Sequence, residues 1–352
     1  MNPGHRRTCP RTGGFTLVEL MIALTLGLLI TGGVISVFIS NKQTYRTNEG
    51  LARIQETARV AFELMAREIR ETGGNPCGTP LVANVLNNPA TSWWSDWAAG
   101  SLIGFNGNQS ATGIVATGTG TAQRVSGTDA ILIKSGTLME SLAITDHVPA
   151  SAQFKLNTTA HGIADGDILM ACDYKTAAIF QVTNASSTNV TIVHNSGTGT
   201  PGNCSKGLGY PTECTALGNQ KQFEDGFLVK LASSFWYIGN NGRGGRSLYR
   251  LGMFGNTGTI AGGAEEIAEG VRDMQIVYLT RNSGTGNLAT AYVEANDASI
   301  NNDWSDSAAN RVVAVRVTLA LETTENLSVD SANPLQRDMI HVISLRNREI
   351  VE

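Results

Sequence analysis

The feature that most constrains this chain is a long apolar segment near its amino terminus that carries a single carboxylate. Residues 15–40 read FTLVELMIALTLGLLITGGVISVFIS, and Glu19 is the one charged side chain in that run. At about 1.5 Å per residue, a helix over residues 15–39 extends about 37 Å, enough to cross a hydrocarbon layer of about 30 Å. A charge inside such a span costs about 2.5–3.5 kcal/mol on insertion scales, so an acid kept there indicates a function.

A short polar leader precedes this segment. Residues 1–14 end in Gly13-Gly14, and Phe15-Thr16-Leu17-Val18-Glu19 follow. The junction resembles the processing signature of type IV prepilins and of the related type II secretion pseudopilins; the alternative is an ordinary signal anchor in which Glu19 is accidental. The resemblance implies that a membrane peptidase cuts after Gly14 and that the new amino terminus on Phe15 is methylated. It also implies that Glu19 helps to dock the subunit into a filament.

Counting basic residues does not orient the span. Three lie on each side: Arg6, Arg7 and Arg11 before it, and Lys42, Arg46 and Arg53 after it. The resemblance to prepilins implies a cytoplasmic leader and a head outside the cytoplasm, and the cysteines of the head favour an oxidising compartment as well. We therefore expect a single-pass inner-membrane protein with a periplasmic head, which later joins a pilus at the cell surface.

Four cysteines remain once the leader, with Cys9, is removed. They are Cys77, Cys172, Cys204 and Cys214. An even number outside the cytoplasm predicts two disulfides, for which three pairings are possible. The segment between Cys204 and Cys214 is rich in turn formers, which favours that pair and leaves Cys77 with Cys172. A zinc site is the rival interpretation, but no Cys-x-x-Cys pair or neighbouring histidine supports it.

The helix is expected to continue beyond the membrane. Apolar residues recur there at intervals of three and four, which predicts one buried stripe: Leu51, Ile54, Ala58, Phe62, Met65 and Ile69. Gly73-Gly74 and Pro76 then end the helix. This organisation predicts a leader (1–14), a transmembrane half (15–40), an amphipathic half (41–74) and an extracytoplasmic β-rich globular head (75–352).

After Pro76 the pattern changes to short apolar runs between turn residues. Strands are predicted by alternation and by β-branched residues at 166–183 (two strands with a turn at 173–176), 189–193, 227–238, 247–251, 271–279, 311–321 and 339–345. Residues 104–128 indicate long loops or weak edge strands, and we expect the loops of 78–165 and 195–220 to decorate the surface. The predicted fold class is α+β, with a long helix packed on a mostly antiparallel sheet.

Several segments are similar to the PilW-type minor pilins. They are residues 166–183, 269–278, 312–317 and 345–348, together with a cysteine soon after the helix, Cys77. This resemblance implies a large minor pilin that joins other minor pilins, and through them the major pilin, in a complex that primes the fibre and sits at its tip. The secretion pseudopilin GspJ has a similar role, and a pseudopilin or a tip adhesin or DNA-uptake module are the alternatives. The prepilin peptidase and methyltransferase are further expected partners.

The charge of the chain indicates what it does not bind. The formal net charge is −4, and removing the arginine-bearing leader makes the mature chain three units more negative, which argues against specific nucleic-acid binding. The loop at 280–287 lacks the acidic side chains that calcium requires, and Asp303 and Asp306 are best interpreted as parts of a solvated loop. We therefore predict no metal and no cofactor.

Three further clusters could carry chemistry or binding, and each has a plainer interpretation. His161 with Asp165 and Asp167 suggests a turn entering a strand, and no hydrolase motif surrounds it. The run 242–246 (Gly-Arg-Gly-Gly-Arg) could hold a phosphate but fits a hairpin tip better. A third cluster is Trp93, Trp94 and Trp97, which would form either an exposed binding patch for a partner or glycan or a half-buried loop anchor. No catalytic residue is predicted.

Overall fold

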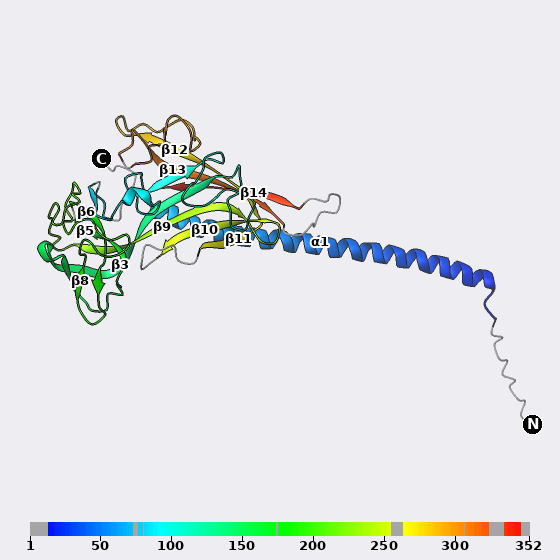
Figure 1. Cartoon of the computed structure of the whole chain (residues 1–352). Coiled ribbons are helices and arrows are strands. Elements are labelled where there is room, and N and C mark those ends of the chain that lie inside the picture. Colours follow the sequence, from blue (N-terminus) through cyan, green and yellow to red (C-terminus); the bar gives the residue numbers. More distant parts are fainter. Residues whose placement is uncertain are drawn as a thin grey trace, which may run out of the picture.

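Figure 1 shows a long helix that projects from a β-rich head. The computed structural model describes residues 13–72, 77–79, 81–173, 175–254, 263–305, 307–323 and 334–345. Helix α1 spans Leu17–Glu71 and is 55 residues long. Its first half projects away from the head and its second half packs on the sheets, so the rod predicted from the sequence is confirmed. Gly73, Gly74 and Pro76 lie outside the described residues.

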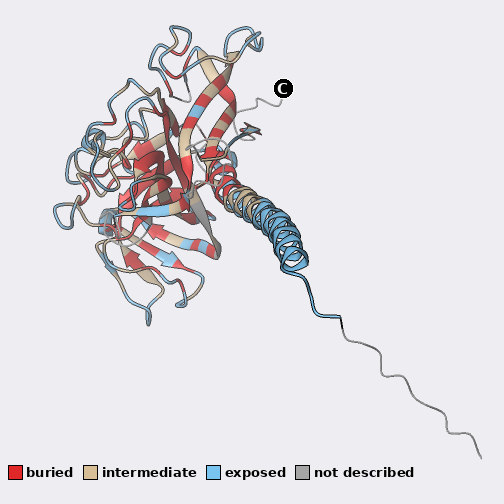
Figure 2. Ribbon diagram, turned by 90° about the vertical axis from the view of Figure 1, so that its right-hand side faces the viewer, coloured by how far each residue is buried: buried red, intermediate tan, exposed pale blue. Residues whose placement is uncertain are grey.

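The burial of α1 changes along its length, as Figure 2 shows by the change from blue to red. Its buried residues all lie in the last four turns: Ala58, Ala61, Phe62, Met65, Ala66 and Ile69. Four of these belong to the predicted stripe, while Leu51 and Ile54 at its start are only partly buried. The periodic spacing therefore identified the face of the helix that packs on the head, because residues three and four apart share one side of a helix.

The larger sheet contains eleven strands among the described residues. Its main path runs β1-β6-β5-β9-β3-β4-β8-β7, with β10 beside β9, β11 beside β10 and β2 beside β3. The strands are β1 (Val82–Asn84), β2 (Leu102–Phe105), β3 (Ala130–Val148), β4 (Gln153–Leu156), β5 (Ile168–Cys172), β6 (Ala177–Gln181), β7 (Asn184–Ala185), β8 (Thr191–Val193), β9 (Phe227–Asn240), β10 (Arg246–Phe254) and β11 (Ala264–Glu269). All described pairings are antiparallel except β1 with β6.

A second sheet has three antiparallel strands in the order β12-β13-β14. These are β12 (Val271–Asn282), β13 (Asn310–Glu322) and β14 (Gln336–Ser344). The main core lies between α1 and both sheets, and it joins Met65 and Ile69 of the helix to residues such as Trp236 of β9 and Val317 of β13. The helix is thus the element on which the two sheets meet.

Most strand predictions are confirmed, and one expectation is wrong. Strands occupy the predicted segments from residue 166 onward, including the β5–β6 hairpin, and the fold is α+β as expected. Residues 78–165, however, are not merely surface loops. They contain β3, a strand of 19 residues that pairs with β2, β4 and β9 in the middle of the larger sheet.

The physical reason for that error lies in the polar residues of β3. Lys134 interrupts the apolar run that begins at Ala130, and yet the residue is completely buried. Its ammonium donates hydrogen bonds to the carbonyl oxygens of Asp96 and Gly100, the latter at 2.9 Å. A buried cation is tolerated when its donors are satisfied, and the acceptors here come from a loop that sequence periodicity does not place beside the strand.

Candidate docking helix and its attachment to the head

The amino-terminal site is a helix start built around Glu19. Gly13 to Thr16 precede the helix, and Thr16 is its N-cap. The Glu19 main-chain N–H donates to Thr16 Oγ1 at 3.2 Å, and the Thr16 main-chain N–H donates to Glu19 Oε2 at 3.1 Å. This reciprocal capping box satisfies two of the N–H groups that a helix start leaves without partners. In the single chain, the Glu19 carboxylate is therefore held by its own helix terminus.

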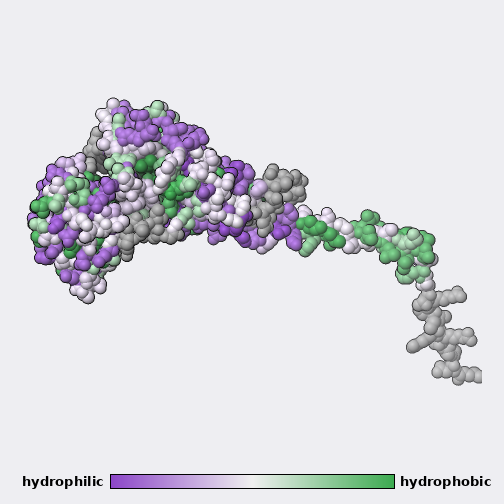
Figure 3. Space-filling model, viewed as in Figure 1, coloured by the Kyte–Doolittle hydropathy of each residue, from purple (hydrophilic) through white to green (hydrophobic). Residues whose placement is uncertain are grey.

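The first half of α1 presents apolar side chains on every side. Figure 3 shows them as the green part of the helix, remote from the polar surface of the head. The helix is long and apolar enough to cross a membrane, and the apolar window has no buried residue. Phe15, which follows Gly14, is 84% exposed. A helix that is apolar all round needs a lipid or protein environment, because an exposed surface of this kind is unfavourable in water.

The second half of α1 is attached to the larger sheet through Glu68, a residue that no sequence pattern singled out. The Glu68 carboxylate accepts hydrogen bonds from Ser234 Oγ at 2.6 Å and from Trp236 Nε1 at 2.7 Å, both on β9. Its second oxygen accepts from Arg250 Nη1 of β10 at 2.9 Å. Arg250 also pairs with Glu265 of β11 at 2.7 Å. One helical carboxylate thus joins two strands, in surroundings where charge-assisted hydrogen bonds are strong.

The same half of α1 reaches the smaller sheet through Phe62. Its ring stacks on the imidazole of His341 in β14, with centroids 3.7 Å apart and an interplanar angle of 18°. Phe62 and Glu68 lie six residues apart and contact different sheets. The orientation of the helix relative to the head is therefore fixed at two separate places.

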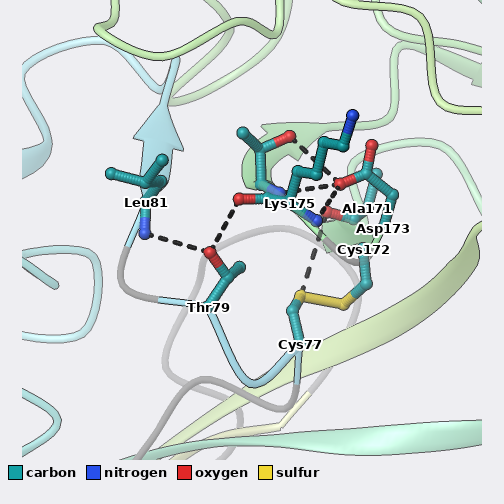
Figure 4. Close-up of a disulfide and its surroundings, with 8 residues drawn as sticks. Cys77, Thr79, Leu81, Ala171, Cys172, Asp173 and Lys175 are labelled. Carbon is teal, nitrogen blue, oxygen red and sulfur yellow. Dashed lines mark hydrogen bonds between the residues drawn. A yellow bond between two sulfur atoms is a disulfide. The ribbon is translucent and has the colours of Figure 1, made fainter.

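A disulfide reinforces this attachment just beyond the end of the helix. Cys77 is bonded to Cys172 at the end of β5, as Figure 4 shows. Thr79 Oγ1 donates to the Lys175 carbonyl at 2.8 Å and accepts from the Leu81 N–H at 3.3 Å, which holds the next residues against the β5–β6 turn (Figure 4). The chain leaving α1 is therefore tied covalently and by hydrogen bonds to the interior of the larger sheet.

The second disulfide joins Cys204 to Cys214 and closes a local loop. Both disulfides have the pairing that the turn-rich spacing favoured, so Cys77, Cys172, Cys204 and Cys214 are used in disulfides rather than as zinc ligands. Among the described residues, no group of three or more His, Cys, Asp or Glu side chains is placed to hold a metal ion. Cys9 and Asp306 lie outside the described residues.

The polar clusters weighed from the sequence have structural partners. His161 Nε2 lies 3.2 Å from the Ser186 carbonyl oxygen and 3.1 Å from that of Asn189. The buried Asp167 pairs with Lys230 at 3.1 Å. Arg243 is at the tip of the β9–β10 hairpin, where it pairs with Glu266 and Glu269 of β11. These arrangements support the turn and hairpin-tip interpretations, since the charges are already paired within the head.

The tryptophan cluster is a half-buried loop anchor. Trp94 is 6% exposed, while Trp93 and Trp97 are partly buried and pack against the same core. The three rings lie in the segment between Asn84 and β2, and the Trp94 carbonyl accepts from Ser233 Oγ of β9 at 3.1 Å. An exposed patch of three indole rings is therefore not present at this loop.

Comparison with known proteins identifies two parts of the chain. Residues 9–35 match the prokaryotic N-terminal methylation motif, which covers Gly14, Phe15, Glu19 and the start of the span. Residues 235–342 match the type IV pilus-assembly protein W family, PilW, from the second half of β9 into β14. No curated protein and no solved structure matches the chain.

The two matches fall on the two parts that the structure joins. The methylation motif covers the apolar start of α1, and the PilW match covers strands that form the surface on which the end of α1 packs. This combination fits a pilin that is anchored in the inner membrane and later assembled into a pilus. Together the two matches support a type IV pilus minor pilin of the PilW type.

Proposed function

We propose that this PilW-type protein takes part in priming type IV pilus assembly, as a member of a minor-pilin complex at the tip of the fibre. The observation that carries the proposal is Glu19, a lone carboxylate in an apolar helix half in which no residue is buried by the described part of the chain. An acid in such surroundings is costly, and the cost falls when an opposite charge is brought beside it. Assembly provides such a charge.

The opposite charge is created by processing. Cleavage after Gly14 leaves an α-amine on Phe15, next to Thr16, whose N–H and hydroxyl already contact Glu19. Among the described residues of the single chain, the side-chain contacts of Glu19 are those with Thr16 in this capping box. When two helices bundle, the amine of one subunit can pair with the Glu19 carboxylate of its neighbour. Both charges then enter an apolar bundle as a pair, which favours the assembled state over the separate anchors.

The attachment of the head explains why docking of the helix would matter for the whole complex. Glu68, Phe62 and the Cys77–Cys172 disulfide fix the head to the end of α1. The place of the helix in a bundle therefore sets the place of the head. The head is far wider than a helix of about 10–12 Å diameter, which fits an end of the fibre better than a closely repeated position in its shaft (Figure 1).

We assign no enzymatic activity to the chain. It is instead a substrate of the prepilin peptidase, which we propose cuts between Gly14 and Phe15, and of the methyltransferase that modifies the new terminus. Other minor pilins and the major pilin are its proposed partners. The proposed units are the leader (1–14), the transmembrane half (15–40), the amphipathic half (41–74) and the head (75–352).

The test is a deletion strain complemented with the wild-type gene or with Glu19→Ala. We expect few or no fibres in the deletion strain, restoration by the wild type, and no restoration by Glu19→Ala although its mature terminus begins at Phe15 by mass spectrometry. Normal piliation with Glu19→Ala would contradict the docking role. Loss of protein secretion with intact pili in the deletion strain would instead assign the chain to a type II secretion pseudopilus.

A further inference from the structure

Two hollows lie side by side over the edge strand β2, away from the docking helix. One has a volume of about 260 Å³ and the other of about 230 Å³. They share Ala99, Ile103 and Phe105 as lining residues. Because Ile103 and Phe105 lie two residues apart on a strand, their side chains point to the same face, and they form a common wall between the hollows.

The walls of the hollows are built on well-fixed elements. The 92–100 loop is held by Lys134, whose ammonium donates to the carbonyls of Asp96 and Gly100. Gly104 permits a close approach from the other side of β2, since a Cβ there would lie 2.7 Å from the Trp304 ring. Gly100 has a φ of +110°, and a Cβ there would overlap the Trp304 carbonyl. The hollows are therefore formed before any ligand arrives, which lowers the entropic cost of binding.

The lining combines aromatic surface with hydrogen-bonding groups. Trp93 lines the smaller hollow, Trp304 the larger, and Phe105 both. Trp93 and Phe105 are partly exposed, whereas Trp304 is only 5% exposed. The uncharged polar and acidic side chains around them are those of Thr91, Ser92, Asp96, Gln109, Ser110, Thr112, Asn302 and Asp303. Apolar surface with a few placed polar groups is the usual composition of a small-molecule site.

The charges at the hollows select among possible ligands. Of the described residues that line them, Lys134 is the single cation, and it is completely buried with its ammonium on backbone carbonyls. Asp96 and Asp303 contribute carboxylates. Phosphate or nucleic acid would be repelled by these carboxylates. A purely apolar ligand would remove the amides and carboxylates from water without offering them partners. A neutral molecule with one apolar face and many hydroxyl groups avoids both costs.

We propose that the two hollows bind a neutral saccharide, with one sugar ring in each and Phe105 between them. The C–H face of a sugar ring packs on an aromatic ring, as Trp93 and Phe105 allow. Sugar hydroxyls donate to the carboxylates of Asp96 and Asp303, and they exchange hydrogen bonds with the amides of Gln109 and Asn302. This binding goes beyond the assembly role, because it would let a subunit exposed on the fibre attach to glycans on a surface.

The test uses the full chain in a zwitterionic detergent, because alkyl maltosides would compete for the site. Tryptophan fluorescence and saturation-transfer NMR follow titrations with cellobiose, chitobiose, lactose and maltose. Sialyllactose, inorganic phosphate and spermidine serve as charged probes. We expect saturable binding of at least one neutral disaccharide, no binding of phosphate, and weaker binding of spermidine than of the disaccharide. Trp93→Ala should weaken this binding about tenfold, and Trp93→Phe should restore part of it.

Two more variants separate a binding effect from a folding effect. Asn302 has a φ of +56°, so Asn302→Gly removes the amide and keeps the backbone conformation accessible. It should weaken saccharide binding without changing thermal unfolding. Trp97→Phe is the matched control, since Trp97 is in the same loop but lines neither hollow. It should bind as the wild type does.

The outcomes that overturn the proposal are distinct from those that overturn the assembly role. Absence of saturable binding for all four neutral disaccharides would overturn it, as would preferential binding of phosphate or spermidine. Equal affinity in the wild type, Trp93→Ala and Asn302→Gly would overturn it as well. Piliation is measured in the same strains. Normal fibres in Trp93→Ala with lost saccharide binding would support two separate functions in one chain.

Discussion

The imidazole rings of His147 and His194 face each other in the interior of the head, with their Nε2 atoms 3.2 Å apart. The main-chain N–H of Phe223 donates to His147 Nδ1 at 3.2 Å. His147 therefore carries its proton on Nε2 and donates it to His194, and both rings are neutral. Burial lowers the pKa of His147 from 6.5 to about 4 and that of His194 from 6.5 to about 3.

This pair predicts a loss of stability in mild acid. In the unfolded chain both rings bind protons near pH 6.5, whereas in the folded head they do so only near pH 4 and 3. The stability that the two neutral rings contribute is therefore complete above pH 6.5 and is lost as the pH falls toward the pKa values of the folded state. At about pH 5 the loss in the free energy of unfolding is about 2 kcal/mol per ring. Urea unfolding at about pH 7.5 and about pH 5 measures it.

The variant for that experiment is His194→Phe. Its readout is the difference in the free energy of unfolding between the two pH values. The absolute stability falls at both values, because the Nε2–H of His147 loses its acceptor. The drop in the free energy of unfolding from the higher to the lower pH should nevertheless be about 2 kcal/mol smaller than in the wild type, since one titrating ring has been removed. An unchanged drop would show that the pair does not titrate as its burial requires.

Asp129 should have the opposite effect on stability as the pH falls. It joins the two sheets: its main-chain N–H donates to the Met274 carbonyl at 2.8 Å, and its carboxylate accepts from the N–H groups of Gly107 at 2.8 Å and Ile276 at 2.7 Å. Burial raises the pKa of Asp129 from 3.8 to about 6 in spite of these donors. The folded head then binds this proton more tightly than the unfolded chain, so Asp129 adds stability as the pH falls from about 6 toward 3.8.

Replacing this carboxyl should expose the full effect of the histidine pair. In Asp129→Asn we expect a larger drop in the free energy of unfolding between about pH 7.5 and about pH 5 than in the wild type, because the opposing group no longer titrates. The same denaturation series provides the measurement. A smaller drop than in the wild type would mean that Asp129 loses rather than adds stability in acid.

Glu68 should contribute more to stability than any other acid in the last turn of α1. Its carboxylate contacts Ser234, Trp236 and Arg250 and is 18% exposed. Glu68→Gln keeps the shape but removes the charge and one acceptor, and we expect a loss of about 1–3 kcal/mol in the free energy of unfolding. The matched control is Glu71→Gln, whose partner Arg67 is 78% exposed. That change should cost at most about 1 kcal/mol. Equal losses in the two variants would contradict the role of Glu68 as the main polar attachment of the helix.

The example of Glu68 also shows what the sequence could and could not predict. Periodicity found the helix, its buried stripe and most strands from β5 onward, because the spacing of apolar residues is a local property. It missed the short β7 and also β11, whose residues include three glutamates. Glu68 was not found, since its partners lie 166, 168 and 182 residues further along the chain. Local sequence patterns do not predict contacts between residues that are so far apart in the chain.

The same limit applies to the 104–128 segment and to the hollows over β2. The segment was predicted to form long loops or weak edge strands, and its order comes from Arg124. This residue is 1% exposed and donates to the carbonyls of Gln109, Asn106 and Thr128. A lone arginine among glycine and threonine residues gives no sign that it is buried. The larger hollow likewise brings Gln109 beside Asn302, which lies 193 residues further along the chain, so only the fold reveals it.

The two disulfides should differ in their effect on stability. The Cys77–Cys172 bond links residues 95 apart in sequence, and the Cys204–Cys214 bond links residues 10 apart. On the chain-entropy account, the longer loop restricts the unfolded state more, by about 2 kcal/mol. We expect the Cys77→Ser/Cys172→Ser double variant to lose that much more unfolding free energy than the Cys204→Ser/Cys214→Ser double variant. Denaturation of both under oxidising conditions gives the comparison, and a reversed order would contradict it.

Gly14 should be important for processing and unimportant for folding. A Cβ placed at Gly14 meets no atom within 4 Å, and the same holds at Gly13. Any effect of a larger residue at Gly14 must therefore arise in the peptidase site rather than in this chain. We expect Gly14→Ala to slow cleavage and Gly14→Glu to abolish it, which would appear as a slower-migrating precursor on gels and as an uncut terminus by mass spectrometry. Gly13→Ala is the matched control and should be cleaved normally. If Gly14→Glu still yielded a chain that begins at Phe15, the requirement for a small residue at Gly14 would be wrong. A wild-type chain that began at another residue would contradict both the cleavage position and the docking role of Glu19 that depends on the freed amine.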